Sequence, residues 1–207
     1  MIVGVLGFQG GVYEHIYAIR RAMEKKDVNG EVLVVKKPGE LQSVDALIIP
    51  GGESTTIGIV ARRVGVIDLI KDRVADGMPV LGTCAGAIML AKRVTDRFVG
   101  EKSQPLLGVM DIEVVRNYFG RQRESFEAGV EIEGMEGVFR GIFIRSPAIK
   151  SAWGKARITG WVSYRGEKIG AVAVQGASMA TAFHPELAGD LRIHEYWLER
   201  VLETLKR

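Results

Sequence analysis

The chain has 207 residues, of which 47% are hydrophobic and 26% are charged, and its formal net charge is +3. The length suits one domain with a sizeable core, and the basic residues are dispersed among acidic ones, so nucleic-acid binding is not expected. No apolar stretch is long enough to span a bilayer and the short apolar run at 2–8 has no basic leader, so no membrane association is expected.

Short apolar runs and helical patterns alternate in the first half of the chain. The run at 2–6 is apolar apart from one glycine, as is typical of a central strand buried on both faces of a sheet. This alternation indicates an α/β fold. Strands are expected at 2–6, 31–35, 46–49 and 80–81, and helices at 13–26, 57–63, 67–75 and 87–92.

A glycine-rich loop, Gly-Phe-Gln-Gly-Gly at 7–11, follows the first strand. It lacks the full G-x-G-x-x-G pattern of a dinucleotide-binding loop, and no well-placed acidic residue follows the second strand. We therefore expect no nucleotide cofactor. Gln9 nevertheless lies at the carboxyl end of a strand, where open α/β sheets bind their ligands.

The third strand leads into Pro-Gly-Gly-Glu-Ser-Thr-Thr at 50–56. Gly51 and Gly52 allow backbone N–H groups to turn towards a ligand, and Ser54 or Thr55 could cap the helix that follows. The segment is either a plain capped loop or part of an oxyanion hole. The cysteine turn described next favours the oxyanion hole.

Cys84 lies in Gly-Thr-Cys-Ala-Gly at 82–86, between a short strand and a helical run. This is the form of a nucleophile elbow with cysteine in place of serine, in which small neighbours permit a sharp turn and the sulfur lies at a helix N-terminus. The alternative is a buried structural cysteine. As the only cysteine, Cys84 cannot form an internal disulfide, which fits a free thiol in the cytoplasm.

After about Arg97 the alternation of strands and helices stops. The pattern there predicts an antiparallel extension of the sheet, with hairpins near the site. Because we find no repeat or linker, we expect a single domain over 1–207. The last helix is expected at 190–206, with Tyr196, Trp197, Val201 and Leu205 facing the core. Strands are expected at 112–115, 129–132, 141–144, 158–164, 169–175 and 179–182.

Phe-His-Pro-Glu at 183–186 places two polar side chains two residues apart. Proline favours an extended residue before it, so His184 and Glu186 are expected to project to the same side, with the carboxylate orienting the imidazole. The other two histidines, His15 and His194, lie in helical patterns and are interpreted as surface or packing residues.

Two arginines follow strands of the second half. Arg116 opens a polar loop at 116–122, and Arg145 follows the strand that ends near Ile144. Either arginine could be a solvated surface charge or a ligand for an anion.

Together these segments resemble the class I glutamine amidotransferases, which use a Cys-His-Glu triad in that chain order. Within that family the chain looks like the glutaminase subunits of pyridoxal 5′-phosphate synthases, and the resemblance covers essentially the whole chain. Tyr118 departs from the pattern, which commonly has serine there. The matching segments are Gly-x-Gln-Gly at 7–10, Pro-Gly-Gly-Glu-Ser-Thr-Thr at 50–56, Gly-Thr-Cys-Ala-Gly at 82–86, Arg-Asn-x-Phe-Gly-Arg-Gln at 116–122, Ser-Phe-Glu at 125–127 and Phe-His-Pro-Glu at 183–186.

The resemblance implies a flavodoxin-like, three-layer αβα sandwich with a mixed, mostly parallel sheet. It also implies hydrolysis of L-glutamine to glutamate and ammonia by Cys84, His184 and Glu186. The ammonia would pass to a (βα)8-barrel synthase subunit in a large hetero-oligomer for vitamin B6 biosynthesis. No metal or cofactor is implied.

The resemblance further implies binding roles for residues around the triad. The oxyanion hole would use the backbone N–H groups of Gly52 and Ala85, and Gln9 would contact the partner or act in a switch. The substrate-binding positions would be Gly51, Gly52, Glu53, Arg116, Ile144 and Arg145. Alternatives are a glutaminase for another synthase, such as one of histidine or purine biosynthesis, a related cysteine hydrolase, and a non-catalytic regulatory subunit.

Overall fold

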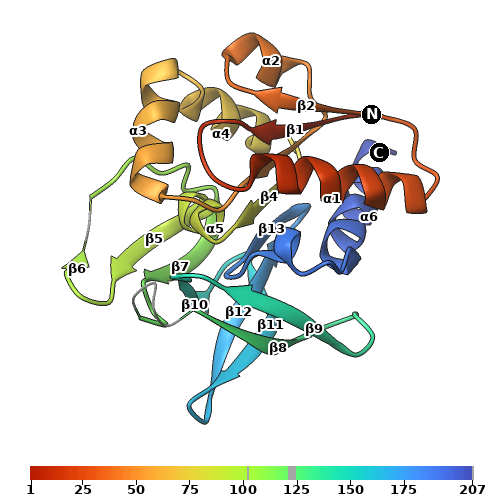
Figure 1. Cartoon of the computed structure of the whole chain (residues 1–207). Helices are drawn as coiled ribbons and strands as arrows, with labels where there is room; N and C mark the ends of the chain where they lie inside the picture. The colour runs from red at the N-terminus through yellow and green to blue at the C-terminus, as the bar shows by residue number, and fades with distance from the viewer. Residues whose placement is uncertain (102, 121–124, 207) are drawn as a thin grey trace.

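One mixed β-sheet runs through the part of the chain that the computed structural model describes, residues 1–101, 103–120 and 125–206 (Figure 1). Its main path has the strand order β2-β1-β3-β4-β13-β12-β10-β7-β5-β6. The first five strands of this path run parallel to one another. They are β2 (Glu31–Val35), β1 (Ile2–Leu6), β3 (Ala46–Ile49), β4 (Val80–Thr83) and β13 (Ser178–Thr181).

The remaining strands extend the sheet, mostly by antiparallel pairing. β12 pairs antiparallel with β13 and β10, and β10 pairs antiparallel with β7, whereas β5 runs parallel to β7. From β12, a branch through β11 to β8 and β9 forms an arm at the bottom of Figure 1. The mixed sheet with its antiparallel extension confirms the predicted fold class. These strands are β5 (Ala91–Asp96), β6 (Gly100–Glu101), β7 (Met110–Arg116), β8 (Phe126–Ile132), β9 (Val138–Phe143), β10 (Ala148–Ala152), β11 (Arg157–Tyr164) and β12 (Glu167–Gln175).

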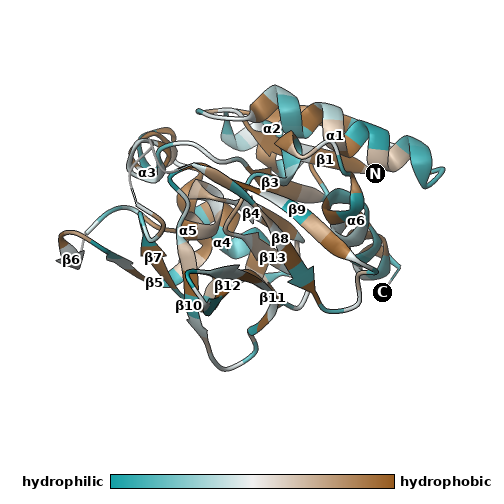
Figure 2. Cartoon of the chain, turned by 60° about the horizontal axis from the view of Figure 1, so that its bottom comes forward, coloured by the Kyte–Doolittle hydropathy of each residue, from teal (hydrophilic) through white to brown (hydrophobic). Residues whose placement is uncertain are grey.

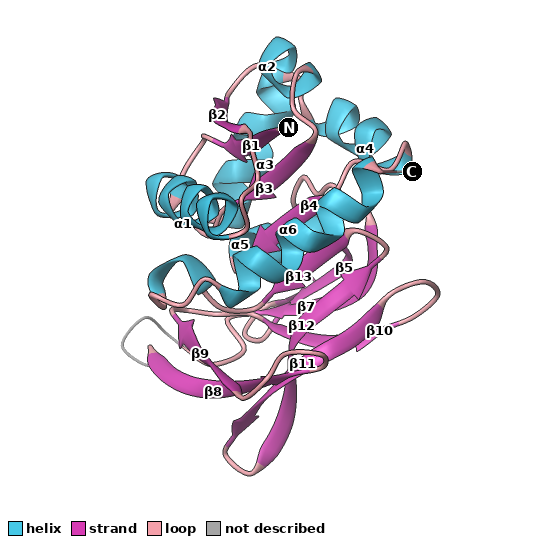
Figure 3. Ribbon diagram, turned by 90° about the vertical axis from the view of Figure 1, so that its right-hand side faces the viewer, coloured by secondary structure: helices cyan, strands magenta, loops and turns pink. Residues whose placement is uncertain are grey.

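Helices cover both faces of the parallel half, which gives three layers (Figure 3). Successive side chains of a strand point to opposite faces, so Ile48 of β3 packs with one group of helices while Leu47 and Ile49 pack with the other. The first group is α1 (Val12–Lys25) and α6 (Arg192–Leu205). The second group is α2 (Pro38–Gln42), α3 (Ser54–Val64), α4 (Ile67–Ala75) and α5 (Ala85–Leu90).

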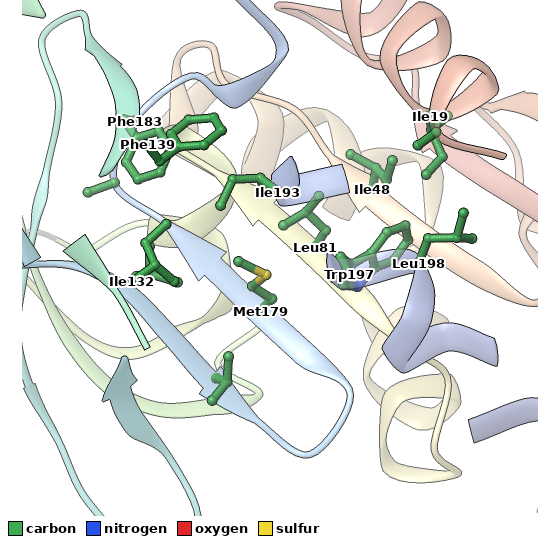
Figure 4. Close-up of a cluster of buried hydrophobic side chains, with 14 of the residues drawn as sticks. Ile19, Ile48, Leu81, Ile132, Phe139, Met179, Phe183, Ile193, Trp197 and Leu198 are labelled. Atoms are coloured by element: carbon green, nitrogen blue, oxygen red, sulfur yellow. The ribbon is translucent and has the colours of Figure 1, made fainter. Parts of the chain in front are cut away.

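The core beneath α1 and α6 joins the parallel half of the sheet to the antiparallel arm. Trp197 of α6 is fully buried with Leu81 of β4 and Phe139 of β9 in one cluster (Figure 4). The strands around it are largely brown, the hydrophobic colour, in Figure 2. Full burial of a side chain of this kind stabilises the fold by roughly 1.5–3 kcal/mol. Phe183 belongs to the same cluster, which anchors the segment that continues into His184.

Several elements differ from the sequence prediction. The helix expected at 87–92 is α5, which begins at Ala85 because Cys84 is its N-cap, and β5 follows at once. The short helix α2 and the strands β5, β6 and β10 were not predicted; β5 carries exposed charged residues near its start and has no apolar run. In α6, Trp197 and Val201 are buried and Tyr196 is partly buried, whereas Leu205 in the last turn is 46% exposed. Within the described residues, no helix has the length and apolar composition needed to cross a lipid bilayer.

Candidate functional site

Cys84 lies on a tight turn between β4 and α5. Its backbone angles, φ 49° and ψ −102°, are unusual for a residue with a side chain, and its N–H donates to the Thr181 carbonyl of β13 at 2.8 Å. The flanking glycines make the turn possible, because a Cβ on Gly82 would lie 2.6 Å from the Gly86 carbonyl carbon and one on Gly86 would lie 3.0 Å from that of Ile49. The local geometry is that of a nucleophile elbow, and the thiol-bearing residue is 6% exposed.

His184 and Glu186 follow β13, the strand beside the elbow. The His184 N–H donates to the Ile142 carbonyl of β9 at 2.9 Å, and its ring Nδ1 lies 2.8 Å from Glu186 Oε1. Glu186 lies in a short 3-10 turn, Pro185–Leu187, so the segment is not extended throughout as the sequence argument assumed. The turn nevertheless brings the carboxylate to the imidazole.

The charges of this pair support one another in a buried setting. Burial opposes the charge of His184, but contacts with Cys84 and Glu186 outweigh it and raise the pKa of His184 to about 10. Burial likewise opposes the charge of Glu186, yet His15 and His184 hold the pKa of this carboxyl below its ordinary value. At neutral pH the imidazole of His184 is therefore protonated beside the cysteine and can act as a proton donor.

The loop after β3 packs directly against this pair. A Cβ on Gly51 would lie 2.9 Å from His184 Nδ1, closer still to its Cε1, and 3.3 Å from Cys84 Cβ. The Gly51 carbonyl in turn lies against the Cα of Gly10, where no side chain would fit. One residue on, the Glu53 N–H donates to Gln9 Oε1 at 2.9 Å. The loop after β1 therefore holds the Gly51–Gly52 segment in place.

A pocket of about 240 Å³ opens in front of the cysteine. Its volume is below the roughly 300–1,000 Å³ of pockets for drug-sized ligands and suits a molecule of amino-acid size. Among the described residues, no group of three or more His, Cys, Asp or Glu side chains is arranged to hold a metal ion. The pocket is lined by Gln9, Gly52, Glu53, Ser54, Cys84, Ile88, Arg116, Asn117, Ile144, Arg145 and His184.

Arg116 is 8% exposed, so it is not a solvated surface charge. Its guanidinium donates to Glu53 Oε1 at 3.1 Å and to Gln104 Oε1 at 2.6 Å, and it lies 4.0 Å from the Asp96 carboxylate. Gln104 was not among the predicted site residues, since it lies in a segment without regular secondary structure whose sequence carries no motif. The Arg116 guanidinium at the pocket is thus held in its orientation by the Glu53 carboxylate and the Gln104 amide oxygen.

Glu53 has two structural tasks at once. Its side chain accepts from the Thr56 N–H at 2.8 Å and so caps α3, in place of the predicted Ser54 or Thr55. Burial raises the pKa of its carboxyl, but the backbone N–H groups of Thr56 and Thr55 and the charge of Arg116 reverse this and lower it. The pocket therefore contains a fixed carboxylate beside a fixed guanidinium.

Ile144 and Arg145 approach the pocket from the end of β9. The Ile144 carbonyl lies 3.9 Å from Cys84 Sγ, and its N–H donates to Ser146 Oγ at 3.1 Å. Arg145 is exposed and has a positive φ of 47°, which turns the chain at the pocket rim. Arg121 and Gln122 of the polar loop lie outside the described residues.

The sequence argument missed a link between the site and two buried histidines. His15 of α1 and His194 of α6 are completely buried, and His15 Nε2 lies 3.3 Å from Glu186 Oε2. They are packing residues, as one of the two interpretations held, but His15 packs against Glu186 and His194 packs against His15. A clue was available, because α1 begins directly after the Gln9 loop and its first turns therefore lie at the site edge of the sheet.

Comparison with known proteins shows which family this chain is similar to. A family model described as the SNO glutamine amidotransferase family matches residues 5–203. The chain is 62% identical over 201 residues to "Pyridoxal 5'-phosphate synthase subunit PdxT" of Aeropyrum pernix, covering 97% of this chain and 99% of that one. It is 52% identical over 204 residues to the protein of the same name from Staphylothermus marinus, covering 98% and 100%. A solved structure titled "Crystal structure of glutamine amidotransferase" superposes with a TM-score of 0.81 at 41% identity, covering 97% and 99%.

Proposed function

Because the chain belongs to the SNO glutamine amidotransferase family, we propose that it is the glutaminase subunit of a pyridoxal 5′-phosphate synthase. It hydrolyses L-glutamine to glutamate and ammonia and supplies the ammonia to a synthase subunit. The observation that carries the proposal is the Cys84 elbow facing His184, in a chain that matches synthase subunits over nearly its whole length. We take residues 1–207 as one glutaminase domain.

The reaction begins with attack of the Cys84 thiolate on the carboxamide carbon of glutamine. His184 holds the thiol proton and gives it to the leaving ammonia, which leaves a glutamyl thioester on the sulfur. His184 then takes a proton from water, the hydroxide attacks the thioester, and glutamate leaves with return of the proton to the thiol–imidazole pair. Proton transfer of this kind contributes about 10²–10⁴-fold to the rate.

Glu186 and two backbone groups support these steps. Glu186 Oε1, 2.8 Å from His184 Nδ1, holds the ring and leaves its Nε2 to exchange protons with Cys84 and the substrate. The negative charge of the tetrahedral intermediate is stabilised by the N–H of Ala85, the residue after the nucleophile, and by that of Gly52. Loss of one such donor costs roughly 2.7–4 kcal/mol of transition-state stabilisation.

The two charged ends of glutamine match the two kinds of charge in the pocket. We assign the Glu53 carboxylate to the substrate ammonium, and Arg116 and Arg145 to its carboxylate, with backbone contacts from Gly51 and from Ile144 beside Arg145. The mutual pairing of Arg116 and Glu53 at 3.1 Å supports this assignment, because it pre-orients both groups before substrate arrives.

We propose that binding of the synthase subunit switches on glutamine hydrolysis. We place the synthase, a (βα)8 barrel in a large cytoplasmic hetero-oligomer, at the carboxyl edge of the sheet around exposed Gln9, with ammonia passing through a tunnel. Gln9 holds the loop that carries Gly52, so docking there can turn the Gly52 N–H towards the oxyanion. Glutamine then tightens the complex, since coupling between two binding sites is reciprocal.

The test measures glutamate release by the purified wild-type chain and by Cys84→Ala, each with and without the synthase subunit. We expect release by the wild type, faster with the partner, and none by the variant, with unchanged melting temperatures. An electrophilic glutamine analogue should label Cys84 alone. Labelling at another residue, or hydrolysis by Cys84→Ala, would disprove the assignment. Full activity of the lone chain, with no effect of glutamine on association, would disprove the switch.

A further inference from the structure

A line of four buried polar side chains runs from the nucleophile into the core between α1 and α6. His184 Nδ1 contacts Glu186 Oε1 at 2.8 Å, and Glu186 Oε2 lies 3.3 Å from His15 Nε2. His15 Nδ1 in turn lies 3.1 Å from His194 Nε2. The Glu186 side chain is 1% exposed and both helical histidines are fully buried, so these contacts lie away from the protein surface.

The second oxygen of Glu186 depends on His15. Among the described residues, Oε2 has no hydrogen bond of regular geometry, and His15 Nε2 at 3.3 Å is the ion-pair partner on that side. A buried carboxylate oxygen without a donor is costly, by about 1–3 kcal/mol or more. His15 Nε2 makes its hydrogen bond of regular geometry with Thr83 Oγ1 at 3.0 Å, so its contact with the carboxylate at 3.3 Å is a close electrostatic one.

The contacts determine where the protons lie. Burial lowers the pKa of His15 and lowers that of His194 to about 3, so both rings are neutral at pH 7 and each carries one ring hydrogen. If His15 carried its hydrogen on Nδ1, the lone pair of Nε2 would face the Glu186 carboxylate. The favourable tautomer therefore has Nε2–H towards Glu186, and His15 Nδ1 accepts from the Nε2–H of His194.

We propose that His15 is a positioning residue of the glutaminase reaction, whose Nε2–H faces Glu186 Oε2 at 3.3 Å and which is held in that tautomer by His194. This inference rests on the proposed function, since it concerns the same site. With a ring nitrogen against each oxygen, the Glu186 carboxylate is held against rotation away from His184. The direction of the His184 ring towards Cys84 is thus fixed from α1 and α6.

His15 takes no direct part in substrate binding, because it does not line the pocket. Its loss should therefore lower kcat and leave KM nearly unchanged. Loss of the donor also destabilises the carboxylate, so the acidic limb of the kcat/KM profile should move to higher pH. The titratable groups that face this part of the site are Glu14 and His15 of α1, Cys84, His184, Glu186 and His194 of α6.

The experiment compares His15→Gln, His15→Asn and His15→Leu in the complex with the synthase subunit. The glutamine amide reaches the position of Nε2, whereas the asparagine amide reaches only that of Nδ1. We expect His15→Gln to keep at least a third of kcat and the wild-type pH profile. His15→Asn and His15→Leu should lose about 10-fold to 100-fold in kcat, the range of a lost hydrogen bond to a charged group.

Two controls separate positioning from stability and from the proposed function. Ile19→Ala removes buried packing one turn further along α1 without removing a polar group, and should lower the melting temperature with unchanged kinetics. The rate of Cys84 alkylation by iodoacetamide, measured as a function of pH, reports the ionisation of the cysteine–imidazole pair without glutamine. This pH profile should shift to higher pH in His15→Asn. An inactive wild type whose alkylation still responds to His15→Asn would refute the proposed function alone.

Equal kinetics and alkylation in all three His15 variants and the wild type would overturn the role of His15. The same holds if His15→Gln and His15→Asn lose activity equally, because a directed donor distinguishes them. If His15→Leu does not fold, the Gln and Asn pair still decides the question.

Discussion

Replacing Gly51 by alanine should disable the site through one methyl group. The added Cβ would lie 2.9 Å from His184 Nδ1, closer to Cε1, and 3.3 Å from Cys84 Cβ. Gly51 is not among the residues with positive φ, so the backbone itself accepts alanine and the effect is purely steric. The substitution therefore tests the positions of the proposed catalytic side chains without changing any of them.

The size of the effect follows from the overlap. The optimal separation of non-bonded heavy atoms of this kind is about 3.5–4.0 Å, so either the imidazole or the glycine loop must move by roughly 1 Å. A misplacement of about 1 Å at a reacting group can cost 10²-fold in rate. We expect kcat to fall by at least about 100-fold, with overpacking costing about 1–3 kcal/mol of stability.

The assay is glutamate release at 25 °C with saturating synthase subunit, together with the melting temperature and labelling of Cys84 by an electrophilic glutamine analogue. The matched control is Gly39→Ala in α2, where no atom lies within 4 Å of the added Cβ. It should keep full activity and gain about 0.5–1 kcal/mol of stability, because alanine is the better helix residue. If Gly51→Ala retains more than a tenth of wild-type kcat while folded, the placement of His184 against this loop is wrong.

His184→Asn should abolish turnover nearly as fully as loss of Cys84, whereas Glu186→Gln should retain more activity, because Glu186 orients the His184 ring and transfers no proton. Wild-type rates in both variants, measured in steady-state assays, would contradict these roles. Arg116→Ala should raise KM and lower the melting temperature, since a buried ion-pair partner is lost, while exposed Arg145→Ala should raise KM alone. His194 has a folded pKa of about 3 against 6.5 unfolded, so the unfolded chain binds the extra proton and stability falls as pH drops from 6.5 towards 3. At pH 5 this amounts to about 2 kcal/mol, at about 1.36 kcal/mol per pH unit, and His194→Gln should remove it in denaturant titrations at pH 5 and 7.

Local sequence was sufficient where one interaction dominates a short segment. The strands 2–6, 31–35 and 46–49 were predicted with their observed bounds, because the parallel strands of such a sheet are short, mostly apolar runs. The turn at Cys84 was recognised from its small residues, and the close approach of Gly86 to β3 shows why they are small. For the strands, and for Gly82 against Gly86, the residue type and its reason lie within a few positions of each other.

Sequence was insufficient where the deciding partner is distant. The proposed role of His15 depends on Glu186, 171 positions later, and the helical pattern of α1 by itself does not distinguish His15 from a packing residue. Arg116 is buried against Glu53 and Gln104, which come to it from separate segments. Patterns of hydrophobicity determine which face of an element is buried, but not which polar group will meet it there.

The strand order explains why the site forms at one edge. β1, β3 and β4 are parallel neighbours, so their carboxyl ends deliver Gln9, the Gly51 loop and Cys84 to the same edge of the sheet. β13 arrives from an antiparallel hairpin with β12, yet it pairs parallel with β4, in register Thr181 to Thr83. That direction carries the chain on to His184 beside Cys84. If β13 were reversed, the histidine would leave the sheet at the opposite edge, so the antiparallel extension is what allows a residue 100 positions after Cys84 to complete the site.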